Sequence, residues 1–96
     1  MWDFEYDSSK SLKNKDKHGI CFEEAQQLWS DKVKIELLVQ TDPELRFVKI
    51  AAYSNRVWTA VFTERDLKIR LISVRRARKS EVAIYDREKN DYDRRI

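Results

Sequence analysis

The stretch Ile69-Arg70-Leu71-Ile72-Ser73-Val74-Arg75-Arg76-Ala77 joins an apolar strand pattern to a row of arginines. A strand holds successive side chains on alternating faces, so these arginines would lie on a rigid surface. Guanidinium groups stay charged and match the geometry of phosphate, which favours a polyanion as the ligand. Simple alternation places Arg70 on the same face as Arg76, and Ser73 on the same face as Arg75. One of Arg75 and Arg76 would then face the ligand while the other anchors a helix or loop. The alternative is a strand end held by surface salt bridges.

The chain before this stretch predicts three more strands. They are Val33 to Leu37, Arg46 to Tyr53 and Arg56 to Thr63, followed by the arginine strand from Lys68 to Arg75. Ser54-Asn55 and Arg65-Asp66 predict the turns on either side of the third strand. Strands joined by such short loops pair antiparallel.

The two ends of the chain predict helices. They span Ser9 to His18, Phe22 to Trp29 and Arg78 to Lys89, and alternation over Trp2 to Tyr6 predicts a short extra strand. Asp7 or Ser8 would cap the first helix, and Gly19 would end it. The order β-α-α-β-β-β-β-α predicts an α+β fold. We expect a small antiparallel sheet of four to five strands, flanked by helices packed on one face.

The composition predicts a single domain over residues 1–96 with one modest core. The net charge is only +3, yet positive charge is concentrated from Arg65 to Arg78, where Asp66 is the only acid. The single cysteine, Cys21, excludes an internal disulfide and fits a reducing cytoplasm. We find no apolar run long enough to span a membrane, and we expect residues 90–96 to form a frayed tail.

Four segments carry a family resemblance. They are Phe4-Glu5-Tyr6-Asp7 with Lys10; Asn14-Lys15-Asp16-Lys17-His18-Gly19-Ile20 with Phe22-Glu23-Glu24-Ala25; Arg46-Phe47-Val48-Lys49-Ile50; and Thr63-Glu64-Arg65 with the arginine strand. In this order and spacing, from Phe4 to about Glu88, the chain resembles BrnT-type toxins, the ribonuclease halves of bacterial toxin–antitoxin pairs. The resemblance implies a RelE-like fold and a toxin that cleaves RNA and arrests translation and growth in the bacterial cytoplasm. It also implies a BrnA-like, ribbon-helix-helix antitoxin, so that the toxin would reach DNA only indirectly. Cys21 replaces a residue that is often Ser in this family, which would weaken a helix cap.

Metal-independent RNA cleavage needs an acid, a base and cations around the phosphate. His18 is the only residue whose usual pKa lies near neutrality, although a histidine at a helix end can also be purely structural. We expect the catalytic group to comprise His18, Lys17, Arg75 and Arg76, and RNA contacts to come from Arg70, Glu64, Arg65, Ser73 and Asn14. The residues show no metal-ligand spacing and no glycine-rich phosphate loop, so no cofactor is expected.

Two other functions use the same residues. A non-catalytic nucleic-acid-binding module would combine the arginines with Trp58 or Tyr53 as a stacking platform. A pure interaction protein would use the arginine face to bind an acidic partner.

Overall fold

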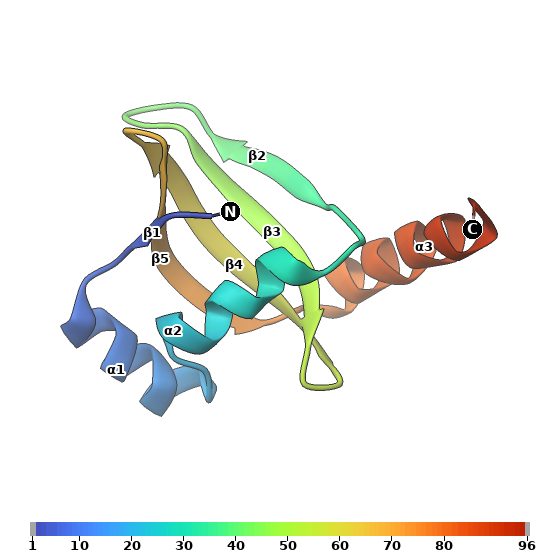
Figure 1. The fold of residues 1–96 in the computed structure, drawn as a ribbon, viewed down its shortest axis with the longest axis horizontal. Coiled ribbons are helices and arrows are strands. Elements are labelled where there is room, and N and C mark those ends of the chain that lie inside the picture. Colours follow the sequence, from blue (N-terminus) through green and yellow to red (C-terminus); the bar gives the residue numbers. More distant parts are fainter. Residues whose placement is uncertain (1, 96) are drawn as a thin grey trace.

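The computed structural model describes residues 2–95, which form three α-helices, one 3-10 helix and five strands. In chain order the elements are β1 (Phe4–Glu5), α1 (Ser8–His18), α2 (Phe22–Ala25), η1 (Gln26–Ser30), β2 (Glu36–Gln40), β3 (Arg46–Tyr53), β4 (Arg56–Arg65), β5 (Lys68–Arg76) and α3 (Lys79–Arg95). The predicted α+β order is confirmed, with the second helix divided into an α-helical turn and a 3-10 segment (Figure 1).

The five strands form one sheet in the order β1-β5-β4-β3-β2. Strands β2 to β5 make the predicted antiparallel meander. The short strand β1 also exists, but it runs parallel to β5, with Phe4 opposite Ile69. The whole meander separates these two strands in the chain, so no short loop forces them to be antiparallel. The sheet is therefore mixed rather than wholly antiparallel.

The ends of α1 and α2 follow from their caps. The Asp7 side chain accepts a hydrogen bond from the Lys10 N–H at 3.1 Å, and Gly19 ends α1 with a left-handed φ of 83°. At α2, the Cys21 sulfur accepts from the Glu24 N–H at 3.5 Å, while the Glu24 carboxylate accepts from the Cys21 N–H at 3.0 Å. Cysteine thus completes a capping box in the position where the sequence predicted a weaker cap.

Several bounds differ from the predicted ones. β2 begins at Glu36, because Val33 and Ile35 instead pack into a buried cluster with α3. The turn between β4 and β5 lies at Asp66 and Leu67, both with positive φ, one residue later than predicted.

The last helix is longer than predicted. The expected end at Lys89 is wrong: α3 continues through Asn90 to Arg95, so this part of the predicted tail is helical, and Ile96 lies outside the described residues. An ion pair between Lys89 and Asp93 at 3.2 Å joins successive turns of this extension. Tyr92 is half-buried against the cluster beneath α3.

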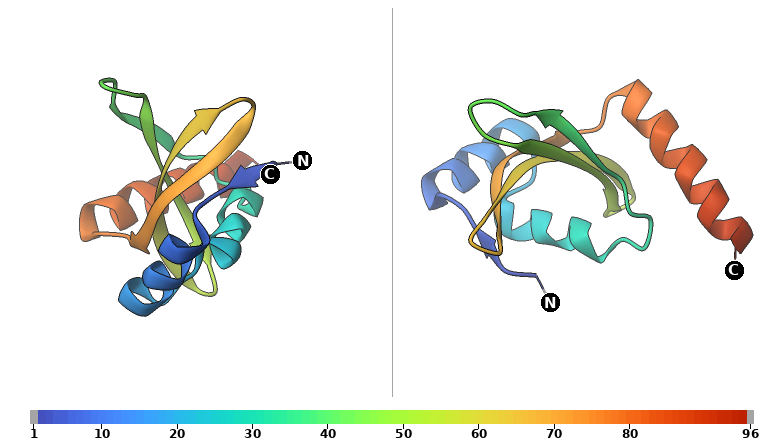
Figure 2. Two further views of the ribbon diagram at one scale, coloured as in Figure 1. Left: turned by 90° about the vertical axis from the view of Figure 1, so that its left-hand side faces the viewer. Right: turned by 90° about the horizontal axis from the view of Figure 1, so that it is seen from above.

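The core has two parts, one on each face of the sheet. The sheet curves around α2 and η1, which pack onto Trp58, Ala60 and Phe62 of β4 (Figure 2). Helix α3 packs on the other face through Tyr85, beside Val57. The expectation that all helices cover one face is therefore wrong, because residues of both parities along β3 and β4 are apolar. Among residues 2–95, no helix combines the length and apolar character needed to cross a bilayer.

Candidate phosphate-binding site between α1 and β5

A β-bulge in β5 determines which of its arginines share a face. The pairing of β5 with β4 shifts by one residue, so that Ile72 is an extra residue between two regular stretches. Cross-strand partners point to the same face, and the register therefore places Arg70 with Ser73 and Arg75. Arg76 lies on the opposite face, next to α2 and η1. The expectation that Arg70 and Arg76 share a face is wrong, because simple alternation does not count the bulged residue.

The adjacent arginines have different surroundings. Arg75 donates two hydrogen bonds to the Glu81 carboxylate, at 2.7 and 3.0 Å, and so ties β5 to the first turn of α3. These bonds, with one from the Arg78 backbone N–H, lower the pKa of Glu81 to about 2. Arg76 is exposed and lies over the Trp58 ring at 5.8 Å, and no carboxylate pairs with it among residues 2–95. Arg75 is thus the anchor, and Arg76 is the accessible cation.

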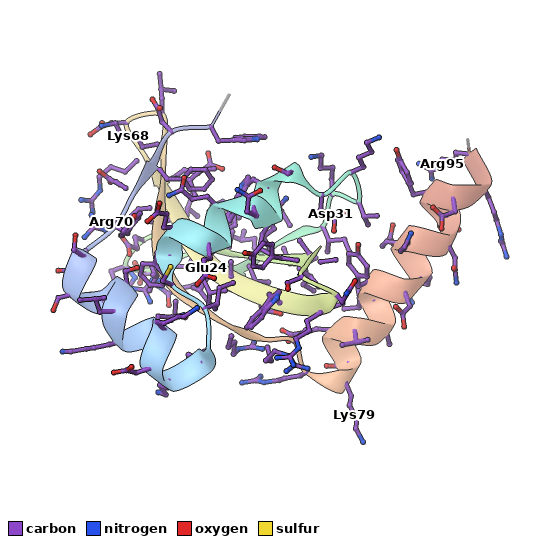
Figure 3. All side chains as sticks on the ribbon, turned by 60° about the horizontal axis from the view of Figure 1, so that its bottom comes forward. Glu24, Asp31, Lys68, Arg70, Lys79 and Arg95 are labelled. Atoms are coloured by element: carbon purple, nitrogen blue, oxygen red, sulfur yellow. The ribbon has the colours of Figure 1, made fainter. Side chains whose placement is uncertain are left out.

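Three of the predicted RNA contacts, Arg70, Arg65 and Glu64, lie at or near the start of β5, at the opposite end from Arg75 and Arg76. Arg70 pairs with Glu5 of β1 at 3.7 Å, and Arg65 approaches Glu44 at 4.0 Å. Figure 3 shows Arg70 on the side of β1 and α1, far from Lys79 at the start of α3. Glu64 is exposed and lines a separate depression. The structure therefore does not bring these side chains together with Arg76.

Asn14 attaches α1 to the outer edge of β5. Its amide nitrogen donates to the carbonyls of Ile20 at 2.7 Å and Val74 at 2.9 Å, and its oxygen accepts from the Val74 N–H at 3.2 Å. The Asn14 side chain is buried. Its bonds pair the backbone N–H and carbonyl of Val74, which lies in a part of β5 that β1 does not cover. Asn14 thereby fixes the position of α1 along β5.

This attachment assembles a basic depression of about 190 Å³ between α1 and β5. We call Lys10, Lys13, Lys17 and His18, which line it from the helix, the α1 cation cluster. Ser73 and the bulge residue Ile72 line it from the strand. Four of the predicted site residues (Asn14, Lys17, His18 and Ser73) therefore line this depression.

Lys10 and Lys13 belong to this site but were not predicted as site residues. Their spacing from Lys17 (i, i+3 and i+7) places all three on one face of a helix, which is the signal that would have found them. None of the three pairs with a carboxylate among the described residues. Lys15, which points elsewhere, pairs with Glu24 at 2.8 Å, and this hydrogen bond raises the pKa of Lys15.

The chemistry of the depression suits an anion. None of the described residues that line it is acidic, so its three lysines have no counter-ion within the depression. His18 is half-buried at the C-terminal end of α1, and its imidazole borders the depression. A hydroxyl, an imidazole and several ammonium groups can together bind a phosphodiester and move a proton beside it.

The fold and this site describe a small α+β protein with a depression lined by lysines and a histidine. The comparison with protein families agrees: residues 6–81 match the family described as the ribonuclease toxin, BrnT, of type II toxin–antitoxin systems. The chain belongs to the BrnT family, whose toxins act on RNA and have a cognate antitoxin. No individually curated protein matches the chain.

Proposed function

We propose that this chain is a metal-independent endoribonuclease of the mRNA interferase type, which cleaves RNA at the α1 cation cluster. Its action would arrest translation and growth in the bacterial cytoplasm. One observation supports the proposal: α1 and β5 bring His18, three lysines and Ser73 into one depression, and among residues 2–95 no carboxylate lines it or pairs with these lysines. The family match supports the ribonuclease activity, and the site supplies the groups that the reaction needs.

The reaction follows from these groups. Neutral His18 would take the proton of the 2′-hydroxyl, whose oxygen then attacks the neighbouring phosphorus. The bond between phosphorus and the 5′ oxygen breaks, and the departing oxygen takes a proton from the ammonium of Lys13 or Lys17. The lysines stabilise the negative charge that builds up on the phosphoryl oxygens, and Ser73 can donate a hydrogen bond to one of them. The products are a 2′,3′-cyclic phosphate and a free 5′-hydroxyl.

The arginines would act outside this centre. Arg76 is exposed, so it can contact a flanking phosphate. Trp58 beneath it is buried in the core, so its ring is not open to a stacked base. Arg70 can make a similar contact if RNA displaces Glu5 from it. The ion pair between Arg70 and Glu5 is weak, because its charged atoms are 3.7 Å apart and both side chains are partly exposed. Arg75 is assigned to positioning, since its guanidinium is occupied by Glu81.

The test is cleavage of total RNA by the purified chain in EDTA, with the termini of the products identified. General acid–base catalysis contributes about 10²- to 10⁴-fold, so His18→Gln is expected to lose that factor while keeping its melting temperature. The double variant Lys13→Gln/Lys17→Gln should also lose activity. Lys79→Gln, which removes an exposed lysine at the start of α3, is the matched control and should cleave normally.

Three outcomes would contradict the proposal. Unchanged cleavage by His18→Gln with a lowered melting temperature would make this histidine structural. Binding of RNA without cleavage by the wild-type chain would favour a nucleic-acid-binding module. Cleavage that EDTA abolishes would contradict metal independence.

We further propose that the antitoxin is a BrnA-like, ribbon-helix-helix protein that covers the cationic surface with an acidic segment. Opposite charges across an interface increase both the rate and the specificity of association. The unpaired lysines of the α1 cation cluster and the exposed Arg76 offer such a surface. The antitoxin, rather than this chain, would then recognise operator DNA.

A further inference from the structure

The outer side of β2 has no partner strand among residues 2–95. β2 is the last strand of the sheet, at the opposite edge from β1 and α1 (Figure 1). The Ile50 N–H donates to the Ile35 carbonyl at 3.2 Å, so the backbone groups of Ile35 point toward β3. In an antiparallel pair this direction alternates, and the backbone groups of Glu36 and Leu38 therefore point away from the sheet. A strand with such free groups is a template for pairing with another chain.

The side chains of this edge are apolar although they are exposed. Leu37, Leu38 and Val39 are 42%, 53% and 56% exposed, respectively. A soluble protein usually protects an edge strand with charges or proline, and this edge has neither at these three positions. We call residues 36–39 the β2 edge.

Apolar packing joins the β2 edge to a neighbouring depression. Leu38 pairs with Phe47, whose ring stacks on Phe62 with centroids 5.5 Å apart. Phe62 lines a depression of about 290 Å³, together with Trp2 and Trp29 among other residues. Leu67, at the tip of the β4–β5 turn, lines the same depression and is fully exposed.

The charge of this depression is opposite to that of the RNA site. Asp3, Glu36 and Glu64 line it, against a single lysine, Lys68. Glu36 pairs with the buried Lys49 at 3.2 Å, but Asp3 and Glu64 have no ion-pair partner among residues 2–95. Two unpaired carboxylates beside exposed aromatic and aliphatic side chains repel RNA and attract a cationic, apolar peptide.

We propose that the β2 edge binds an extended segment of the cognate antitoxin, which adds a strand to the sheet. Its apolar side chains would cover Leu38, and a lysine or arginine in it would reach Asp3 and Glu64. Main-chain hydrogen bonds supply the affinity in this mode of recognition, and the side-chain pockets supply the specificity. A second copy of the chain would fit less well. If two copies paired through their β2 edges, each would bring the carboxylates of its own depression toward those of the other, and these like charges repel. The proposal deepens the proposed function by assigning the antitoxin a contact remote from the RNA site.

The experiment measures the affinity of the purified chain for the purified antitoxin encoded with it, by biolayer interferometry. Leu38→Pro removes an N–H that points away from β3, so it blocks strand addition without breaking a bond of the sheet. Asp3→Lys reverses one charge of the depression, and Asp91→Lys makes the same change on exposed α3 as a control. Circular dichroism checks that each variant is folded, and Leu38→Lys replaces Leu38→Pro if the proline variant is not.

We expect Leu38→Pro and Asp3→Lys each to weaken antitoxin binding by about tenfold or more, whereas Asp91→Lys binds normally. All three should cleave RNA like the wild type, because neither Leu38 nor Asp3 nor Asp91 lines the α1 cation cluster. Wild-type affinity in both edge variants would overturn the proposal. A wild-type chain that dimerises, and becomes monomeric in Leu38→Pro with antitoxin binding unchanged, would assign the edge to a second copy instead. Lack of cleavage by the wild type would refute the proposed function but not the binding result.

Discussion

Replacing Arg75 with alanine should destabilise the protein, whereas the same change at Arg76 should not. The Arg75–Glu81 pair is bidentate, and its side chains are only 24% and 16% exposed. Removing Arg75 leaves a largely buried carboxylate with only the Arg78 backbone N–H as a donor. The two bonds join the same two groups and act as one pair, and a hydrogen bond to a charged group is worth about 1.5–3 kcal/mol, so we expect a loss of about 2 kcal/mol in the free energy of unfolding. For a domain of this size, that loss lowers the melting temperature by about 8–16 °C.

Arg76→Ala removes only an exposed cation–π contact with Trp58. Such a contact is worth about 0.5–1 kcal/mol, so the melting temperature should fall by no more than about 8 °C. RNA affinity should respond in the opposite order, with Arg76→Ala binding more weakly than a folded Arg75→Lys variant. Thermal unfolding followed by circular dichroism, together with RNA binding below the melting temperature, measures both quantities.

A double-mutant cycle tests the physical reason. Arg75→Ala and Glu81→Ala should be strongly non-additive, because each change removes the same pair of hydrogen bonds. Arg76→Ala combined with Glu81→Ala should be additive and serves as the control. The reasoning fails if Arg76→Ala destabilises the chain as much as Arg75→Ala, or if the Arg75–Glu81 cycle shows no coupling.

Asn14→Ala should lower the free energy of unfolding by about 2–4 kcal/mol, because the carbonyls of Ile20 and Val74 lose their donor. Urea unfolding measures this loss, and an unchanged urea midpoint would contradict the role given to Asn14. Acid should remove the contribution of Glu81 to the free energy of unfolding. The pKa of this carboxylate is lowered in the folded state, so the ionised group stabilises the fold above its usual pKa of 4.5. That stabilisation is lost as the pH falls toward about 2. Between these pH values, the stability of Glu81→Gln should therefore decline less steeply than that of the wild type, and parallel declines would refute the linkage.

The antiparallel meander could be predicted because its information is local. Alternating side chains in β3, β4 and β5, and a left-handed turn at Ser54 and Asn55, depend on neighbouring residues alone. The helix end at Gly19 is predictable for the same reason, since glycine adopts a positive φ without steric cost. The sequence also indicated His18 and Lys17 as candidates, once the family resemblance suggested RNA cleavage, and strand alternation placed Ser73 on one face with Arg75.

Only the tertiary structure decided how these residues combine. The bulge at Ile72 places Arg70 and Arg76 on opposite faces of β5. It depends on the pairing between β4 and β5, which the pattern of one strand does not contain. The choice of Arg75 as the anchor depends on the direction in which α3 leaves β5, although Glu81 follows Arg75 closely in the chain. Likewise, Asn14 lies far from Val74 in the chain, and their contact is what places α1 along β5 and closes the site. Long-range contacts of this kind cannot be read from local periodicity, because a side chain's partner is set by the path of the whole chain.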